Sequence, residues 1–216
     1  SRLDKNLFYS PEQIDYLKQI WEFKGSDNFL KAFYQAKSTN RELRILVLLA
    51  EFADVQFTHD ADYFDALFNQ VGYNVNGNEG SVRDYFTAST FGHVTVIADV
   101  YGPYRSSAGQ AAYGYNTVGM IGAKNLLTEM ISLADQDVNY SNYANYGGNY
   151  VDCVYMIYAG CSYSNGELNA IWPHRSGLYP AIQKDGVYVQ DYACSSELGG
   201  TTQYGTTPPV VGTVCH

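Results

Sequence analysis

Histidines are the side chains of this sequence that best fit metal-dependent catalysis, and the four of them are His59, His93, His174 and His216. A zinc peptidase holds its metal with two neutral imidazoles at helix positions i and i+4, and a glutamate between them polarises the bound water. His59 and His93 have no partner at that spacing, so we interpret them as structural. No histidine lies beside Ser195 or Ser196 in the sequence, and nothing else indicates a serine hydrolase.

An oxygen-rich run lies in the middle of the chain and is a candidate calcium site, because calcium takes several carboxylate and carbonyl oxygens from one flexible loop. Its members are Asp135, Asp137, Asn139, Asn142, Asn145, Asn149 and Asp152. The charged ligands of such a site would be Asp137 and Asp152. The EF-hand pattern is absent from the run, and a turn-forming Asn/Gly loop is the other interpretation.

Four cysteines, Cys153, Cys161, Cys194 and Cys215, allow three disulfide pairings. Cys153 with Cys161 would bridge the end of a strand, and Cys194 with Cys215 would fix the C-terminal segment. Free buried thiols are an equally good interpretation. No Cys-x-x-Cys occurs, which argues against a structural zinc knuckle.

Composition excludes some classes of function. The net charge is −9, with 13 Lys and Arg against 22 Asp and Glu, so no basic surface is available for nucleic acid. No run approaches the ~18 apolar residues of a membrane span. Tyrosine is unusually frequent, with 21 residues, and its half-polar ring suits half-buried sheets and binding clefts.

Capping residues, glycine and proline positions and apolar patterning predict the secondary-structure elements of the first half. Ser10-Pro11-Glu12-Gln13 is a helix start with a capping box, and a second helix follows from Asp27. The aliphatic run from Arg44 to Phe52 predicts a central strand covered on both faces. Asp60 to Gln70 reads as a helix. Ser81 is expected to cap a short helix that has Asp84 at its third position. A strand is expected from His93 to Tyr101, ended by Gly102-Pro103-Tyr104.

The second half continues the alternation of predicted strands and helices. We expect an exposed loop over 105–116, then a helix from Thr117 to Asp135 that buries Met120, Leu127, Met130, Ile131 and Ala134. The apolar run from Val151 to Ala159 predicts a buried strand. Gly186 to Tyr192 predicts an edge strand. Strands alternating with helices indicate a mixed α/β layer, that is, an α/β (α+β) fold.

Three blocks of the sequence resemble the M6 family of metallopeptidases, the immune inhibitor A type. They are the strand Val151–Ala159 with its flanking glycines, the tetrapeptide Ile171-Trp172-Pro173-His174, and the closing Gly212-Thr213-Val214-Cys215-His216. Gly80 to Phe86 and the Tyr101-Gly102-Pro103 step are also similar to that family. The resemblance implies a zincin-like mixed sheet with backing helices, whose active-site helix and lower subdomain are absent here.

In that family a histidine in the position of His216 opens the His-Glu-x-x-His motif. The resemblance therefore implies that His216 is the first zinc ligand and that a general-base glutamate should follow it. The parent protein would be a secreted zinc metalloendopeptidase that hydrolyses peptide bonds through a zinc-activated water. One imidazole does not supply the ligands that zinc requires, so we expect this chain alone to be inactive.

The resemblance also implies how a protein or peptide substrate would bind. His174 would lie at a cleft wall, and Tyr188 and Tyr192 would lie on an edge strand that receives the substrate backbone. The other interpretations are a structural imidazole bound to a nearby carbonyl for His174 and an ordinary edge hairpin for the strand. Residues 1–40 would be a helical lead-in or a propeptide remnant, and residues 41–216 the N-terminal subdomain of a zincin-like peptidase domain. The rest of the catalytic domain, or self-association, would cover apolar surface left exposed.

A second interpretation belongs to a different class of protein. A Tyr-rich extracellular binding or adhesion module would keep the peptidase fold without its catalysis. The sequence following His216 separates the two, because only a peptidase needs Glu-x-x-His there.

Overall fold

The computed structural model describes residues 41–145 and 148–215 of the 216. The helices expected before residue 40 lie outside these residues, as does His216. The strands are β1 (Arg41–Glu51), β2 (Val94–Arg105), β3 (Val154–Cys161), β4 (His174–Lys184), β5 (Val187–Thr201) and β6 (Gly205–Thr207). The α-helices are α3 (Ala61–Asn69), α4 (Val82–Ser89), α5 (Gln110–Tyr113), α6 (Tyr115–Val118), α7 (Ile121–Leu133) and α8 (Val211–Cys215). Single 3₁₀ turns are η1 (Val75–Gly77), η2 (Ala134–Gln136), η3 (Tyr140–Tyr143) and η4 (Tyr163–Asn165).

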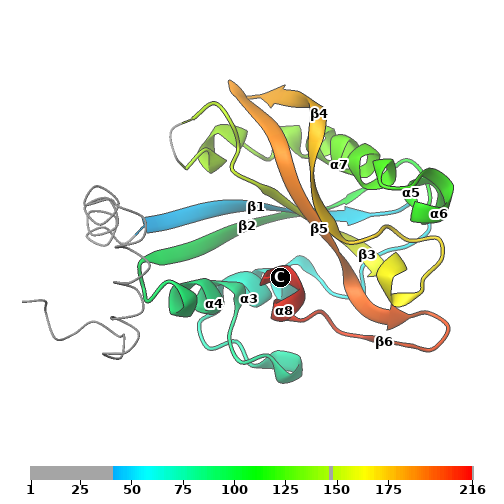
Figure 1. The fold of residues 1–216 in the computed structure, drawn as a ribbon, viewed down its shortest axis with the longest axis horizontal. Helices are drawn as coiled ribbons and strands as arrows, with labels where there is room; N and C mark the ends of the chain where they lie inside the picture. The colour runs from blue at the N-terminus through cyan, green and yellow to red at the C-terminus, as the bar shows by residue number, and fades with distance from the viewer. Residues whose placement is uncertain (1–40, 146–147, 216) are drawn as a thin grey trace, which may run out of the picture.

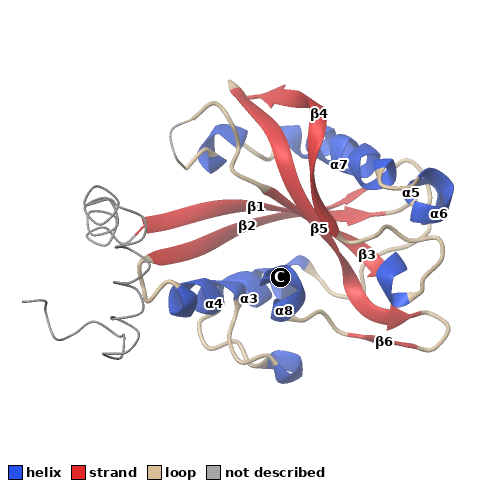
Figure 2. Cartoon of the chain, in the orientation of Figure 1, coloured by secondary structure: helices blue, strands red, loops and turns tan. Residues whose placement is uncertain are grey.

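The strands form one mixed sheet of six strands in the order β2-β1-β3-β5-β4, with β6 paired to the end of β5 (Figure 1). The pairs β1–β2, β1–β3 and β3–β5 are parallel, whereas β4 runs antiparallel to β5. Helices cover both faces: α5, α6 and α7 lie on one, and α3, α4 and α8 on the other (Figure 2). The predicted α+β class is confirmed.

Two buried clusters hold these layers together. Leu46 and Leu48 of β1 pack with Leu126 and Met130 of α7 in the first, which we call the α7-side core. The alternate residues Val47 and Leu49 pack with Phe64 and Leu67 of α3 and with Val211 of α8 in the second, the α8-side core. Because both faces of β1 are buried, its sequence shows an unbroken apolar run, as predicted for a central strand.

The helix expected over 60–70 and the cap expected at Ser81 are both confirmed. The carboxylate of Asp60 accepts the Tyr63 N–H at 2.9 Å and caps α3. The Ser81 hydroxyl accepts the Asp84 N–H at 3.2 Å, while the Asp84 carboxylate accepts the Ser81 N–H at 3.0 Å. This reciprocal pair is the expected capping box of α4.

Three of the expectations for strands, loops and helices are wrong in part. β2 continues through Gly102-Pro103-Tyr104, because a register shift lets Tyr104 and Arg105 pair with Ala50 and Glu51. Residues 105–116 are no simple exposed loop: they contain α5 and the start of α6, and Tyr113 is buried. Met120 precedes α7 and is exposed, whereas the other four apolar residues expected to be buried are buried.

The strand predicted over 186–192 is also misplaced in the sheet. It is the first part of β5, which pairs with β3 on one side and β4 on the other. The edge strand on this side of the sheet is β4, which was not predicted because Gly177 and Pro180 interrupt its apolar pattern. A register shift between Gly177 and Ile182 accommodates these residues.

Candidate functional site

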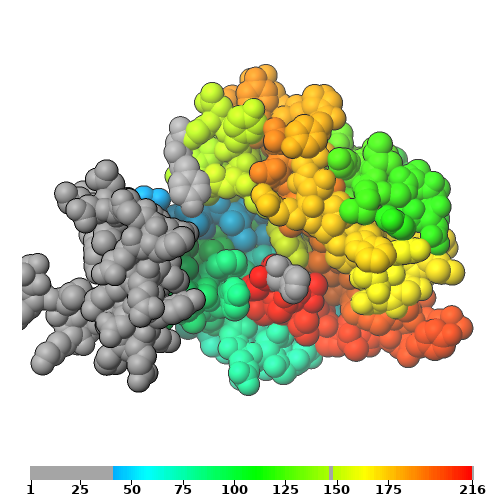
Figure 3. Space-filling model, viewed as in Figure 1, coloured from blue at the N-terminus to red at the C-terminus, as the bar shows by residue number. Residues whose placement is uncertain are grey.

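The chain leaves the sheet after β6 and returns as α8, the short helix that leads directly to His216. The Val211 N–H donates to Oδ1 of Asn78 at 2.9 Å, which fixes the start of α8 against the loop that precedes α4. Val211, Val214 and Cys215 pack against the α8-side core. In the space-filling view α8, in red, lies at the centre of the visible face between the α3–α4 side and the β4 side (Figure 3).

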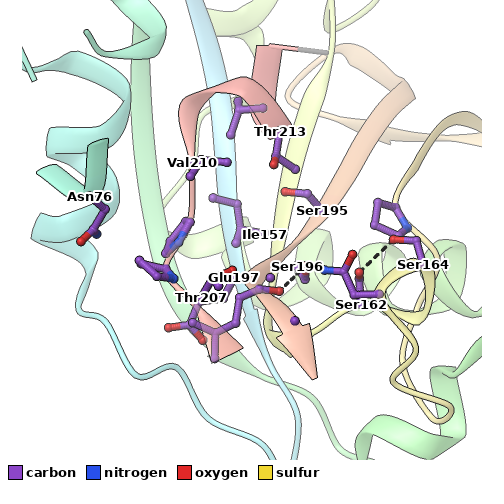
Figure 4. A pocket seen from close by; sticks show the side chains of 18 of the residues that line it. Asn76, Ile157, Ser162, Ser164, Ser195, Ser196, Glu197, Thr207, Val210 and Thr213 are labelled. Atoms are coloured by element: carbon purple, nitrogen blue, oxygen red, sulfur yellow. Dashed lines mark hydrogen bonds between the residues drawn. The ribbon is translucent and has the colours of Figure 1, made fainter. Parts of the chain in front are cut away.

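A cavity of about 640 Å³ lies beside α8. Thr213 of α8, Val210 before it and Thr207 of β6 form one part of its wall, and Ile157 of β3 and Ser195 of β5 form another (Figure 4). The η4 turn and Pro173, which precedes β4, also line the cavity. The lining therefore mixes hydroxyl groups with apolar side chains, and it adjoins the segment that carries the proposed first zinc ligand.

Glu197 of β5 is the charged residue of the cavity lining, and its side chain is 0% exposed. Its Oε1 atom accepts the Thr58 N–H at 2.8 Å and the Thr58 hydroxyl at 2.7 Å. The same atom accepts the His59 N–H at 3.0 Å and lies 2.8 Å from Nδ1 of His59. Its Oε2 atom accepts the Gly160 N–H at 3.3 Å. These bonds compensate the cost of burying the carboxylate and attach the loop before α3 to β5.

Sequence reasoning missed this cluster. Thr58 and Glu197 are separated by 139 positions, and no local pattern links them. His59, which we interpreted as structural, does serve as a structural donor to Glu197 in this arrangement.

His174 lies on the α7 side of the sheet. It pairs in register with Cys194, whose side chain belongs to the α7-side core, whereas α8 packs on the other face. Its Nδ1 donates to the carbonyl of Trp172 at 2.6 Å, and its Nε2 lies 2.8 Å from the Tyr192 hydroxyl. Both ring nitrogens therefore have protein partners.

The two tyrosines expected to bind substrate are in different environments. Tyr192 is fully buried in the α7-side core, where it contacts His174. Tyr188 is half-buried, and its ring lies against that of Tyr150, with centroids 5.4 Å apart. The structure thus brings Tyr192 and His174 together and leaves Tyr188 apart from them on the strand.

The two aspartates of the candidate calcium site do not share a location. Asp137 accepts the Tyr104 hydroxyl at 2.8 Å, and Tyr104 pairs with Ala50 at the end of β1. Asp152 accepts two donors of Asn145, at 3.1 and 2.6 Å, and the Asn145 side chain is bound to the backbone of Arg44 at the start of β1. Among residues 41–145 and 148–215, no group of three or more His, Cys, Asp or Glu side chains is arranged to hold a metal ion.

Zinc is the metal that the resemblance implies, and the described residues do not provide its ligand set. His59 is bound to Glu197, and both nitrogens of His174 are engaged within the fold. His216 lies outside the described residues.

All four cysteines are free thiols in the structure. Cys153 directly precedes β3 and Cys161 ends it, so they lie about 26 Å apart at ~3.3 Å per residue, beyond the ~7 Å that a disulfide spans. Cys194 belongs to the α7-side core and Cys215 packs on the α8-side core, so the sheet separates them. Neither of the two pairings considered from the sequence fits this fold.

We expect the buried thiols to resist modification in the folded chain. Burial raises the pKa of Cys194 to about 12 and the pKa of Cys153 and Cys215 to about 11, which leaves little reactive thiolate at pH 8. Titration with a thiol reagent should find four thiols in denaturant without reductant, and Cys194 should react at least about 50-fold more slowly in the folded state. A Cys194→Ser variant, which lacks this thiol, shows which part of the reaction belongs to Cys194. Fewer than four thiols in denaturant would contradict the free-thiol state.

Within the part of the chain that the structure describes, no helix combines the length and the apolar character needed to cross a membrane.

Comparison with known proteins finds similarity to a metalloprotease precursor. No family model matches the chain. The chain is 26% identical over 207 residues to the pre-pro-metalloprotease PrtV of Vibrio cholerae serotype O1, in strain M66-2 and equally in strain ATCC 39315 (El Tor Inaba N16961). The match covers 77% of this chain and 22% of the relatives, so the chain spans about a fifth of their length. These similarities indicate a distant relationship to metallopeptidases.

Proposed function

We propose that this chain is the N-terminal part of the catalytic domain of a secreted, M6-like zinc metalloendopeptidase. The observation that carries the proposal is the position of α8: the helix that leads into His216 lies along the wall of the cavity and is fixed to both the sheet and the Asn78 loop. Similarity to a pre-pro-metalloprotease supports both the chemistry and the secretion. The mixed sheet with α7 behind it fits the zincin-like arrangement that the sequence resemblance implies.

In this proposal His216 is the first zinc ligand, and the second histidine and the general-base glutamate follow it in the natural protein. The metal would supply a polarised water for peptide hydrolysis. The described residues contribute a preformed cavity for a protein substrate and a rigid support for α8. By itself the 216-residue chain is expected to show no chelator-sensitive cleavage.

The test begins with the natural gene, where the codons after His216 should encode Glu-x-x-His. The natural protein should then contain one zinc per chain by elemental analysis and should cleave a fluorescent casein substrate in a chelator-sensitive way. His216→Ala should lose both the zinc and the cleavage. His93→Ala is the matched control, because His93 directly precedes β2 and does not line the cavity, and it should retain both.

Two results would reject the proposal. One is a His216→Ala protein that keeps its zinc and its cleavage. The other is chelator-sensitive cleavage by the purified 216-residue chain, which would place the catalytic residues elsewhere.

A further inference from the structure

The loop between α3 and α4 makes a tight turn through Val75, Asn76, Gly77 and Asn78. Asn76 has a left-handed backbone, with φ 56° and ψ 34°, and Gly77 also has a positive φ, of 77°. The Asn78 N–H donates to the Val75 carbonyl at 3.2 Å and closes the turn. These angles match a type I′ turn, which favours Asn-Gly because both of its central residues need a positive φ.

The same dipeptide is chemically reactive. An asparagine side chain is most open to attack by the next backbone nitrogen when glycine follows it, because glycine has no side chain to hinder the approach. Asn76 and Gly77 are both exposed. Among the described residues the Gly77 N–H makes no hydrogen bond, and a Cβ atom on Gly77 would meet nothing within 4 Å. The attacking nitrogen is therefore neither held nor shielded.

One hydrogen bond restrains the side chain of Asn76. Its Nδ2 donates to the Tyr63 hydroxyl at 2.9 Å. Tyr63 is held in turn by the rings of His59 and Phe64, with centroids 4.2 and 5.6 Å away. The side-chain carbonyl carbon must turn from this position to meet the Gly77 nitrogen, so the bond to Tyr63 slows the reaction. A single bond at an exposed site restrains the amide only weakly.

A second Asn-Gly pair, Asn165–Gly166, provides an internal reference. Both of its residues are exposed, and Asn165 lines the cavity beside α8, as Asn76 does. In this pair the Gly166 N–H donates to the Tyr163 carbonyl at 2.9 Å, so the nitrogen is engaged in the η4 turn. The sequence alone ranks the two pairs equally, whereas the structure favours reaction at Asn76.

We propose that Asn76 is a site of spontaneous deamidation, with water as the co-reactant, and that its isoaspartate product loosens α8. The Gly77 nitrogen gives its proton to solvent and bonds to Cγ of Asn76, which closes a five-membered succinimide. The Cγ–Nδ2 bond breaks, and the nitrogen takes a proton from solvent and leaves as ammonia. Water then opens the ring at either carbonyl, giving aspartate or isoaspartate. The reaction involves no change of oxidation state and is independent of the proposed peptidase function.

The effect on α8 follows from the position of Asn78. Its Oδ1 atom accepts the Val211 N–H at 2.9 Å, two residues after the reactive asparagine. Isoaspartate carries the main chain through Cγ, so the turn gains one backbone atom and the bond from Asn78 to Val75 no longer closes in the same geometry. Asn76 and Val210 both line the cavity, so the shift occurs where α8 begins (Figure 4). Aspartate adds a charge but leaves the length of the backbone unchanged.

Peptide mapping by mass spectrometry tests the site on the 216-residue chain. After two weeks at pH 8.5 and 37 °C, deamidation at Asn76 should exceed that at Asn165 at least about fivefold. At pH 6 the product at Asn76 should fall at least about fivefold, because the attacking nitrogen must lose its proton. Tyr63→Phe releases the amide and should raise the rate at Asn76 at least about twofold without changing Asn165. Tyr85→Phe is the matched control on the neighbouring helix α4, and it should change neither rate.

Hydrogen exchange measures the effect on α8. The peptide that contains residues 211–215 should exchange at least about threefold faster in the isoaspartate form than in the fresh chain. Asn76→Asp is the matched control, since it carries the charge without the longer backbone, and its α8 should exchange like that of the fresh chain. Asn76→Gln, which lacks the reactive asparagine, should show no change in α8 on incubation.

Two results would overturn the deamidation site. They are equal deamidation of the two Asn-Gly pairs in the parent chain, and a rate at Asn76 that is the same at pH 6 and pH 8.5. A Tyr63→Phe variant that raises both rates alike would show general loosening of the fold instead of release of the amide. Unchanged exchange of α8 in the isoaspartate form would overturn the link to α8. None of these results depends on His216, so they leave the proposed peptidase function to its own test.

Discussion

Glu197→Ala is expected to lower the free energy of unfolding by about 3–5 kcal/mol, the range typical of removing one partner from a buried, hydrogen-bonded charge cluster. The carboxylate is fully buried and accepts bonds from Thr58, His59 and Gly160. Its removal leaves backbone N–H groups without acceptors and opens a gap beside the cavity. Each donor left unpaired costs about 1–3 kcal/mol, although not additively.

Urea unfolding followed by circular dichroism measures this effect. Glu197→Gln keeps an oxygen that can accept the Thr58 and His59 donors, so its loss should be clearly smaller. Glu167→Ala is a matched control, because that carboxylate is bonded to Thr202 nearer the surface, and it should cost no more than about 1 kcal/mol. Equal unfolding midpoints for Glu197→Ala and Glu167→Ala would show that the buried cluster does not stabilise the fold.

Gly122→Ala is expected to cost about 3 kcal/mol, at the upper end of the usual range for overpacking. A Cβ atom at this position would lie 1.8 Å from the Tyr113 carbonyl oxygen and 2.7 Å from its carbon, and these are backbone atoms that no side-chain rotation can move. The first turn of α7 would have to shift away from α5. Because α6 lies between the two in the sequence, the same shift would also move Tyr115, whose ring packs against those of Tyr163 and Trp172.

Gly212→Ala in α8 provides the same chemical change without the clash. No atom lies within 4 Å of the position of its Cβ, and alanine has a better helix propensity than glycine by about 1 kcal/mol. Its stability should therefore be unchanged or slightly higher. Thermal unfolding of the two variants and the parent chain measures the difference. A Gly122→Ala protein as stable as Gly212→Ala would mean that α5 and α7 do not approach as closely as the structure shows.

Elements specified by local chemistry were predictable from the sequence. β1 is an aliphatic run because both of its faces are covered, and the α4 capping box needs only Ser81 and Asp84, three positions apart. The carboxylate of Asp60 at the start of α3 is a similar local signal. In each case the residues that decide the structure are neighbours in the sequence.

Features that depend on distant residues were not predictable. β4 is a strand because β5 offers it a partner, although Gly177 and Pro180 weaken its own pattern. The acceptor for Thr58 is Glu197, and the ring partners of Tyr115 come from segments about 50 positions later. The position of Cys194 and Cys215 on opposite sides of the sheet likewise follows from the topology. It cannot be predicted from the spacing of the cysteines in the sequence.

The bond between Asn78 and the first N–H of α8 joins two segments that are 133 positions apart. The turn that contains Asn78 thereby sets where α8 begins on the sheet. Insertions or deletions in that turn would shift α8 relative to β1 and α3, although the turn is far from α8 in the sequence. Loop length there is thus a geometric control on the placement of α8, and grafting the sheet onto another protein would require transplanting this turn together with α8.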